Sequence, residues 1–170
     1  MEDLKEYLIH LQNEELEYFD EFYNATKKPV FHMIYSYLND TSESEDLLQD
    51  TYIKFLKYKN RINPNKNILA YLLEIAKTIS LNYIKKRKRI VPLDTEIEIP
   101  DNPKENRSLD ESEINKLMRS VLRDIEYQIV ILHVVDGFTH KEISEMLKKP
   151  LGTITWTYNN ALEKIRREYK

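Results

Sequence analysis

The chain has 170 residues, of which 41% are hydrophobic and 32% charged, and its formal net charge is −3 at pH 7. Such a composition is typical of a soluble helical protein with one domain or two small ones. The lack of cysteine excludes disulfides, thiolate metal sites and cysteine nucleophiles, two glycines are too few for glycine-rich phosphate loops, and no apolar run could span a bilayer.

The first forty residues predict helices that build a core. Apolar residues keep a helical spacing over 4–23, with a break near Asn13, and Pro29 is expected to start another segment. His10 and His32 each stand alone in this pattern. We therefore interpret both histidines as packing or surface residues rather than as ligands.

A further helix is expected over 42–60, with Ser42 or Ser44 as its N-cap and acidic residues near its positive end. An outward stripe of this helix carries Asp46, Gln49, Asp50 and Ile53. A solvated acidic face is the usual meaning of such a run. A basic partner is the other reading, because acidic and basic residues are segregated along this chain.

A loop at 60–67 precedes a long helix at 68–89 with a wide apolar face. The helix ends in five consecutive cations at 85–89. These exceed what a helix C-terminus needs, and like charges repel one another unless a polyanion is near. Exposed aromatic, amide and hydroxyl side chains precede them. The combination suits nucleic acid, because phosphates meet the charge and open bases meet the aromatics.

The segment at 90–108 contains three prolines and many acids without a helical period, and we interpret it as an interdomain linker. The chain is therefore divided into an N-terminal helical domain at 1–89 and a C-terminal one at 109–170. Helices are expected at 109–122 and 125–135 in the second domain.

The stretch at 136–169 predicts a helix-turn-helix. Thr139 is placed as an N-cap, with Glu142 three residues later to close a capping box. Gly152 and Thr153 open a second helix, which could enter the major groove of DNA. Its inward positions are Ile154, Tyr158, Ala161 and Ile165, and its outward positions are Thr155, Trp156, Asn159 and Asn160. A plain helical hairpin in a bundle is the alternative.

The sequence contains no recognisable catalytic constellation. Its four histidines are isolated, and neither a metalloprotease motif nor a phosphate-binding loop occurs. We therefore expect no enzyme activity, no cofactor, no metal and no small-molecule substrate.

The segments 45–56, 67–89 and 137–166, with the proline-bearing linker, together resemble an extracytoplasmic-function sigma factor. Such proteins are small initiation subunits of bacterial RNA polymerase. The resemblance implies an all-α fold of two small helical domains on a flexible linker, in the cytoplasm and associated with the nucleoid when bound to polymerase. The implied partners are core RNA polymerase, promoter DNA and an anti-sigma factor.

The resemblance also implies three sets of site residues. Core polymerase would be gripped by Asp46, Leu47, Gln49, Asp50 and Ile53. The proximal promoter element would be recognised and opened, with one base flipped into the loop at 57–66, by Tyr71, Lys77, Thr78, Asn82, Lys85, Lys86, Arg87 and Arg89. The upstream element would be read by Thr139, Lys149, Thr153, Thr155, Trp156, Asn159, Asn160 and Lys164.

The chain departs from the family pattern in both promoter-reading helices. Members often carry Trp, Asn and Asp where this chain has Tyr71, Thr78 and Asn82, so base preference is expected to differ. Threonine and asparagine replace the usual cations of the recognition helix, and asparagine can pair bidentately with adenine. Trp156 could equally contact DNA or an inhibitor protein.

A stand-alone helix-turn-helix regulator is the alternative function. Such a protein would need no polymerase, and its N-terminal half would sense a ligand or dimerise. The acidic stripe at 45–50 and the second basic helix end at 85–89 disfavour it.

Overall fold

A computed structural model of the protein describes residues 4–90 and 118–168, apart from the side chains of residues 89 and 90. Within these ranges every regular element is a helix and no strand occurs, which confirms the expected all-α fold. The elements are α1 (Leu4–Gln12), η1 (Leu16–Tyr18), α2 (Phe19–Leu38), α3 (Thr41–Tyr58), η2 (Lys59–Arg61), α4 (Ile68–Ile90), α6 (Asp124–Val134), α7 (His140–Leu147) and α8 (Leu151–Glu168).

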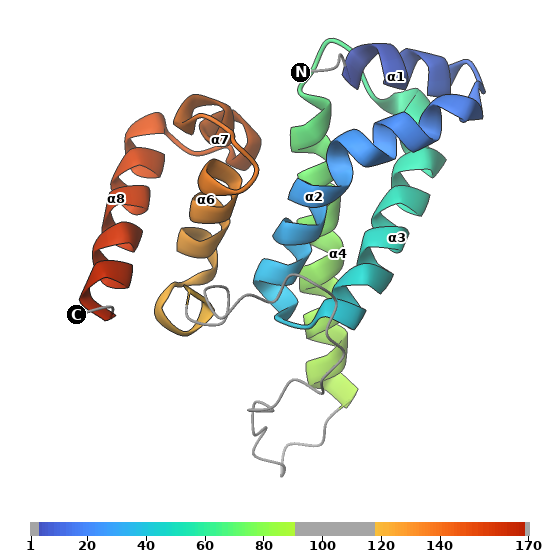
Figure 1. Ribbon diagram of the computed structural model, residues 1–170. Helices are drawn as coiled ribbons and strands as arrows, with labels where there is room; N and C mark the ends of the chain where they lie inside the picture. Colours follow the sequence, from blue (N-terminus) through green and yellow to red (C-terminus); the bar gives the residue numbers. More distant parts are fainter. Residues whose placement is uncertain (1–3, 91–117, 169–170) are drawn as a thin grey trace.

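The helices form two groups that lie side by side (Figure 1). In the first, α2, α3 and α4 run alongside one another and α1 lies across one end. In the second, α6, α7 and α8 pack together beside α2 and α4. None of the helices in the described ranges is both long and apolar enough to cross a membrane.

The expected break near Asn13 is confirmed. The α1 helix ends at Gln12, and Glu14 takes a left-handed backbone with φ 66° before the single turn of η1. This turn redirects the chain so that Leu8 and Leu11 of α1 are buried in the common core.

The expectation that Pro29 starts a helix is wrong, because α2 runs without interruption through it. A proline inside a helix lacks one hydrogen bond and costs about 3 kcal/mol. Tertiary packing offsets this cost, since Phe22 before the proline and Val30 and Ile34 after it are fully buried. Burial of one large apolar side chain contributes about 1.5–3 kcal/mol.

The N-cap of α3 is Asp40, neither Ser42 nor Ser44. Its carboxylate accepts a hydrogen bond from the backbone N–H of Glu43, one of the orphan donors of the first turn. Asn39 ends α2 in a left-handed conformation, so a single polar pair separates the two helices. Ser44 is instead buried, with its hydroxyl donating to the Asp40 carbonyl.

The long helix α4 begins at the predicted residue, Ile68, and ends one residue beyond the predicted end. Asn67 caps it by accepting from the backbone N–H of Ala70. Leu72, Leu73 and Ala76 are buried against the other helices. The basic end projects beyond its neighbours (Figure 1), which leaves its cations at the surface.

The expected linker at 90–108 lies almost wholly outside the described residues, as does most of the helix expected at 109–122. Residues 118–121 of that helix are helical. The next expected helix corresponds to α6, in which all residues from 126 to 132 are buried.

One hydrophobic cluster spans both helix groups. It joins Val30 and Ile34 of α2 to Ile129 and Leu132 of α6. A buried hydrogen bond from Gln128 to the hydroxyl of Ser36 crosses the same boundary. The two groups are therefore packed through a shared core rather than held apart, and the domain division at 90–108 stays a proposal.

Candidate nucleic-acid interface

The predicted helix-turn-helix is present in α7 and α8. Thr139 and Glu142 close the capping box, since the Thr139 hydroxyl accepts from the Glu142 N–H and the Glu142 carboxylate accepts from the Thr139 N–H. These bonds lower the pKa of Glu142. Lys148 ends α7 in a left-handed conformation with φ 52°, and α8 begins at Leu151, one residue earlier than expected.

The outward face of α8 only partly matches its prediction. Trp156 is 65% exposed, and Thr153 and Asn159 are exposed as well. Thr157, which the helical period assigned to neither face, is buried, as is Ile154. The face that solvent reaches is thus centred on Trp156 and Asn159.

Three predicted DNA contacts of α8 have partners within the protein. The hydroxyl of Thr155 lies 3.3 Å from Nδ1 of His140. The amide of Asn160 and the ammonium of Lys164 both donate to the carboxylate of Glu126 on α6. Of the remaining predicted contacts, Thr139 and Lys149 are exposed at the start and end of α7.

Glu126 is a fully buried carboxylate at the base of this group. Burial alone would raise its pKa, but hydrogen bonds from Arg123 and Lys164 lower the pKa to about 2. The backbone N–H of Arg123 adds a further bond of 3.0 Å. Glu126 is therefore ionised at any ordinary pH, and it ties the start of α6 to the middle of α8.

A cluster of rings lies between α6, α7 and α8. The ring of His140 is 4.5 Å from that of His133 and 4.9 Å from that of Tyr158. Within the described part of the chain, Nε2 of His140 is buried and has no hydrogen-bond partner. Burial lowers the pKa of His140, and the nearby His133 lowers it further. The cluster therefore favours neutral imidazole behind the recognition helix.

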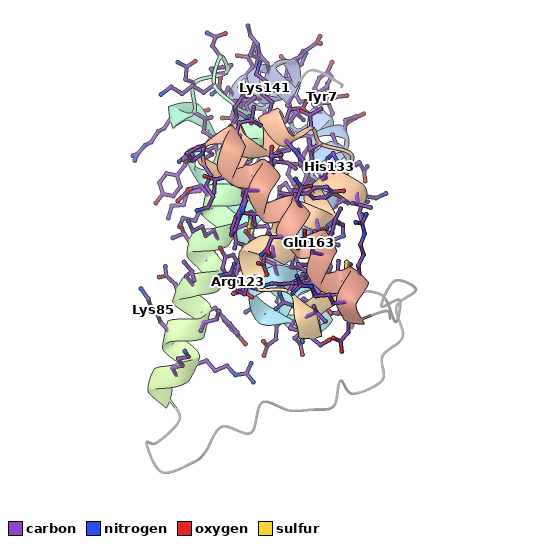
Figure 2. All side chains as sticks on the ribbon, turned by 90° about the vertical axis from the view of Figure 1, so that its left-hand side faces the viewer. Tyr7, Lys85, Arg123, His133, Lys141 and Glu163 are labelled. Carbon is purple, nitrogen blue, oxygen red and sulfur yellow. The ribbon has the colours of Figure 1, made fainter. Side chains whose placement is uncertain are left out.

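The predicted proximal-DNA residues whose side chains are described are exposed on α4. Tyr71, Lys77, Thr78 and Asn82 are all exposed, although the Thr78 hydroxyl donates to the Glu74 carbonyl. Lys85 and Lys86 follow at the projecting end, where Figure 2 labels Lys85. Arg87 is exposed and pairs with Glu43 at 2.9 Å. The side chain of Arg89 lies outside the described residues.

The loop before α4 is braced from the N-terminal helix. The side-chain amide of Gln12 donates to the carbonyls of Lys59 and Ile62 at 2.7 and 2.8 Å. The ammonium of Lys59 is buried and donates to Glu14 at 2.6 Å. In the same loop region, the guanidinium of Arg61 lies 5.3 Å from the ring centroid of Tyr58.

The acidic stripe of α3 is exposed except at one position. Asp46, Gln49 and Asp50 are exposed, and Ile53 is 65% exposed beside them. Leu47 is only 6% exposed and belongs to the core. The surface available to a partner is therefore three polar side chains around one apolar side chain.

The two helix groups meet along a seam that includes two predicted DNA contacts. A cavity of about 270 Å³ at this seam is lined by Lys77 of α4 and by Lys149 after α7. Glu74 of α4 pairs with Lys148 at 3.5 Å. His32 of α2 contacts Asp136, which follows α6. The proximal and upstream surfaces are thus adjacent in this arrangement.

Sequence reasoning missed the residues that act between distant segments. Glu126 lies within an apolar stretch, so hydrophobic patterning does not mark it. Its place three residues after the N-cap of α6 is nevertheless a capping signal. The sequence pattern leaves His32 isolated, and it does not mark Gln12. No local pattern marks either residue, because their partners are far away in the chain. Among the described residues no group of three or more metal-ligating side chains occurs.

Comparison with known proteins matches residues 22–90 to the family model for sigma-70 region 2. The chain is 21% identical over 168 residues to the ECF RNA polymerase sigma factor SigW of Bacillus subtilis, covering 89% of each chain. It is also 21% identical over 173 residues to the ECF RNA polymerase sigma factor SigK of Mycolicibacterium vanbaalenii, covering 97% of this chain and 88% of that one.

Two solved structures share the fold. The sigma factor RpoE of Bartonella quintana, in complex with the anti-sigma factor NepR, superposes with a TM-score of 0.70 and 21% identity over 89% of this chain and 96% of that one. CnrH, in complex with the cytosolic domain of CnrY, superposes with a TM-score of 0.71 and 10% identity over 99% of this chain and 97% of that one.

Proposed function

We propose that the chain is an extracytoplasmic-function sigma factor of the sigma-70 family, because residues 22–90 match the family model for sigma-70 region 2 and both curated relatives are of this type. It binds core RNA polymerase, recognises and opens promoters, and starts transcription without catalysing a reaction itself. In this role it works in the cytoplasm and associates with the nucleoid when bound to polymerase. Core polymerase, promoter DNA and an anti-sigma factor are its partners.

One observation carries this proposal: a single chain presents two DNA-compatible surfaces and one acidic surface. The cations at the end of α4 and the exposed face of α8 each suit DNA. The acidic stripe of α3 does not suit DNA, because phosphates would repel it. A basic protein surface is its natural complement.

We assign polymerase binding to Asp46, Gln49, Asp50 and Ile53. Ile53 offers an exposed apolar anchor, and the two carboxylates around it select a basic partner. Leu47 contributes from below by fixing the helix in the core.

Promoter opening is assigned to α4 and the loop before it. Lys85, Lys86 and Arg87 hold phosphates near the point where strands separate. Tyr58 and Arg61 offer ring and guanidinium faces on which an unstacked base can lie. Tyr71, Thr78 and Asn82 lie about one to four turns earlier on α4, where they meet the bases next to that point.

We assign recognition of the upstream promoter element to α8, whose N-terminal end would enter the major groove of DNA. Thr153, Trp156 and Asn159 face outward there. An asparagine in the major groove discriminates between bases by about 1–3 kcal/mol when it pairs bidentately with adenine.

The DNA surfaces of α4 and α8 cannot contact their promoter elements at the same time while the two helix groups stay packed together. Promoter elements one helical turn apart are already about 34 Å apart along the duplex. Glu74 and Lys148, by contrast, are in contact at 3.5 Å. The arrangement described above therefore represents the free protein, and the two groups separate on polymerase. An anti-sigma factor would act by preventing that separation or by covering one of the surfaces.

In-vitro transcription tests the proposal directly. Purified chain is added to core RNA polymerase and a library of promoter DNA, and the transcripts are sequenced. Start sites that depend on the chain, share two spaced elements and vanish without core polymerase are expected. Sequence-specific DNA binding by the chain alone, with no effect on polymerase start sites, would favour the stand-alone regulator instead.

A further inference from the structure

Glu126 grips the recognition helix at two points one turn apart. Its carboxylate accepts from Asn160 at 3.1 Å and from Lys164 at 2.8 and 2.9 Å. Arg123, labelled in Figure 2, adds a bond of 2.8 Å from its guanidinium. The carboxylate is fully buried, so these bonds are shielded from water. This grip fixes the rotation of α8 about its own axis relative to α6.

The same carboxylate dictates which end of the Asn160 amide faces inward. An ionised carboxylate can only accept hydrogen bonds, so the amide nitrogen must point at Glu126. The carbonyl oxygen of Asn160 then points away from it. Asn160 is half-buried on the flank of the outward face, next to the exposed Asn159.

We propose that Glu126 is a positioning residue that turns the Asn160 carbonyl towards DNA, so that Asn160 selects a base offering a hydrogen-bond donor. In the major groove these donors are the N6 amino group of adenine and the N4 amino group of cytosine. Guanine and thymine offer only acceptors at the corresponding edge, and they are rejected. The inference rests on the proposed function, since it concerns how the upstream element is read.

The test uses polymerase reconstituted with the full chain and a library of promoter duplexes randomised across the upstream element. Wild type should prefer adenine or cytosine at one position, by about fivefold or more over guanine and thymine. Asn160→Ala keeps Glu126, Arg123 and Lys164 together, so it should fold and lose the preference at that position alone. Glu126→Gln should weaken the preference there, because a glutamine amide can donate to Asn160 and allow its amide to turn over.

A paired exchange separates positioning from a merely structural role. In the double variant Glu126→Gln with Asn160→Asp, the glutamine amide donates to the new carboxylate, whose other oxygen still faces outward as an acceptor. The preference for adenine or cytosine should return. Glu163→Gln is the matched control, because it neutralises an exposed acid of the same helix and leaves the Glu126 contacts intact. Thermal unfolding of each variant reports whether it is folded.

Each outcome decides between the two levels of the argument. A wild type that shows no upstream preference at all would count against the proposed function and this inference together. A wild type with clear upstream preference, combined with an unchanged profile in folded Asn160→Ala or Glu126→Gln, would overturn the role of Glu126 alone. Failure of the folded double variant to restore the preference, or a wild-type preference for guanine at the position that Asn160→Ala affects, would also overturn it.

Discussion

His32 and Asp136 are 104 residues apart in the chain, yet the imidazole Nδ1 of His32 lies 3.0 Å from a carboxylate oxygen of Asp136. The Asp136 side chain is only 3% exposed, so the contact is sheltered from solvent. It joins α2 to the turn before the helix-turn-helix and helps to keep the two helix groups together.

Asp136→Asn is expected to loosen the packing between the helix groups. A hydrogen bond involving a charged group contributes about 1.5–3 kcal/mol, and the substitution weakens it without changing the side-chain volume. Small-angle scattering should show a larger maximum dimension for the free variant than for wild type. Glu145→Gln, at an exposed acid of α7, is the control and should scatter like wild type. Identical curves for all three proteins would mean that this contact does not hold the groups together.

Charge reversal of Asp46 and Asp50 is expected to weaken binding to core polymerase. Both carboxylates are exposed one helical turn apart, so their substitution by lysine should leave the fold intact while repelling a basic partner. The measurement is competition with wild type for core polymerase, alongside a thermal unfolding curve. Charge reversal of the exposed Glu6 and Glu21, on α1 and α2 and outside this stripe, is the control. Undiminished competition by the double variant would place the polymerase contact elsewhere.

Replacing Lys85 and Lys86 by glutamine is expected to lower affinity for every promoter DNA alike. Each phosphate contact removed should also reduce the dependence of binding on salt, by roughly one unit of slope in the logarithmic plot. Binding to fork-junction DNA over a range of salt concentrations measures both quantities. A variant at Asn82 should instead change the ranking of sequences. An unchanged salt slope in the lysine variant would exclude these cations from the phosphate contacts.

Gln12→Leu is expected to impair promoter opening more than promoter binding. The substitution removes both hydrogen bonds that hold the carbonyls of Lys59 and Ile62, so the loop at 57–66 loses its brace. Chemical modification of unpaired thymines in the polymerase–promoter complex measures opening. The fraction of promoter duplex that the polymerase complex retains measures binding. Glu6→Gln, at an exposed position of the same helix, should affect neither. Equal loss of binding and opening would indicate a general folding defect instead.

The Glu126 contacts predict how stability depends on acid. The pKa of this group in the folded protein is about 2, below its ordinary value of 4.5. Its contribution is therefore complete above about pH 4.5 and is lost as the pH falls towards 2. It amounts to less than about 3 kcal/mol, because water screens the largely exposed Arg123 partner. Unfolding measured between pH 2 and 6 should show this loss in wild type. The same curve should be flatter for Glu126→Gln, which has no proton to gain.

Sequence patterns predicted the helices well and the links between them poorly. The bounds of α4 and the capping box of Thr139 follow from local rules, namely apolar period and side-chain reach over three residues. The prediction at Pro29 is wrong because burial of apolar side chains on both sides of it outweighs the cost of a proline inside a helix. The partners of Gln12, His32 and Glu126 depend on how distant helices meet, and one sequence alone does not encode that arrangement in any short pattern.

In the candidate site, the sequence predicted which side chains are exposed better than it predicted which ones lack a hydrogen-bond partner within the protein. Helical spacing correctly placed Trp156 and Asn159 outward. It also placed Asn160 outward, but the angle at which α6 crosses behind α8 gives this residue an internal acceptor. Leu47, which the resemblance placed among the polymerase contacts, lies in the core.

Two ion pairs lie on the side of the protein that is proposed to face DNA. Their carboxylates compete with DNA phosphates for the same cations. Arg87 is paired with Glu43, and Lys148 is paired with Glu74. A phosphate that takes either cation must displace a carboxylate first, so the attraction gained on DNA is partly cancelled by the attraction lost in the protein. If the proposed function holds, we expect arbitrary duplex to be held more weakly than the number of cations alone suggests. Base contacts and polymerase contacts at a promoter would then make the exchange favourable.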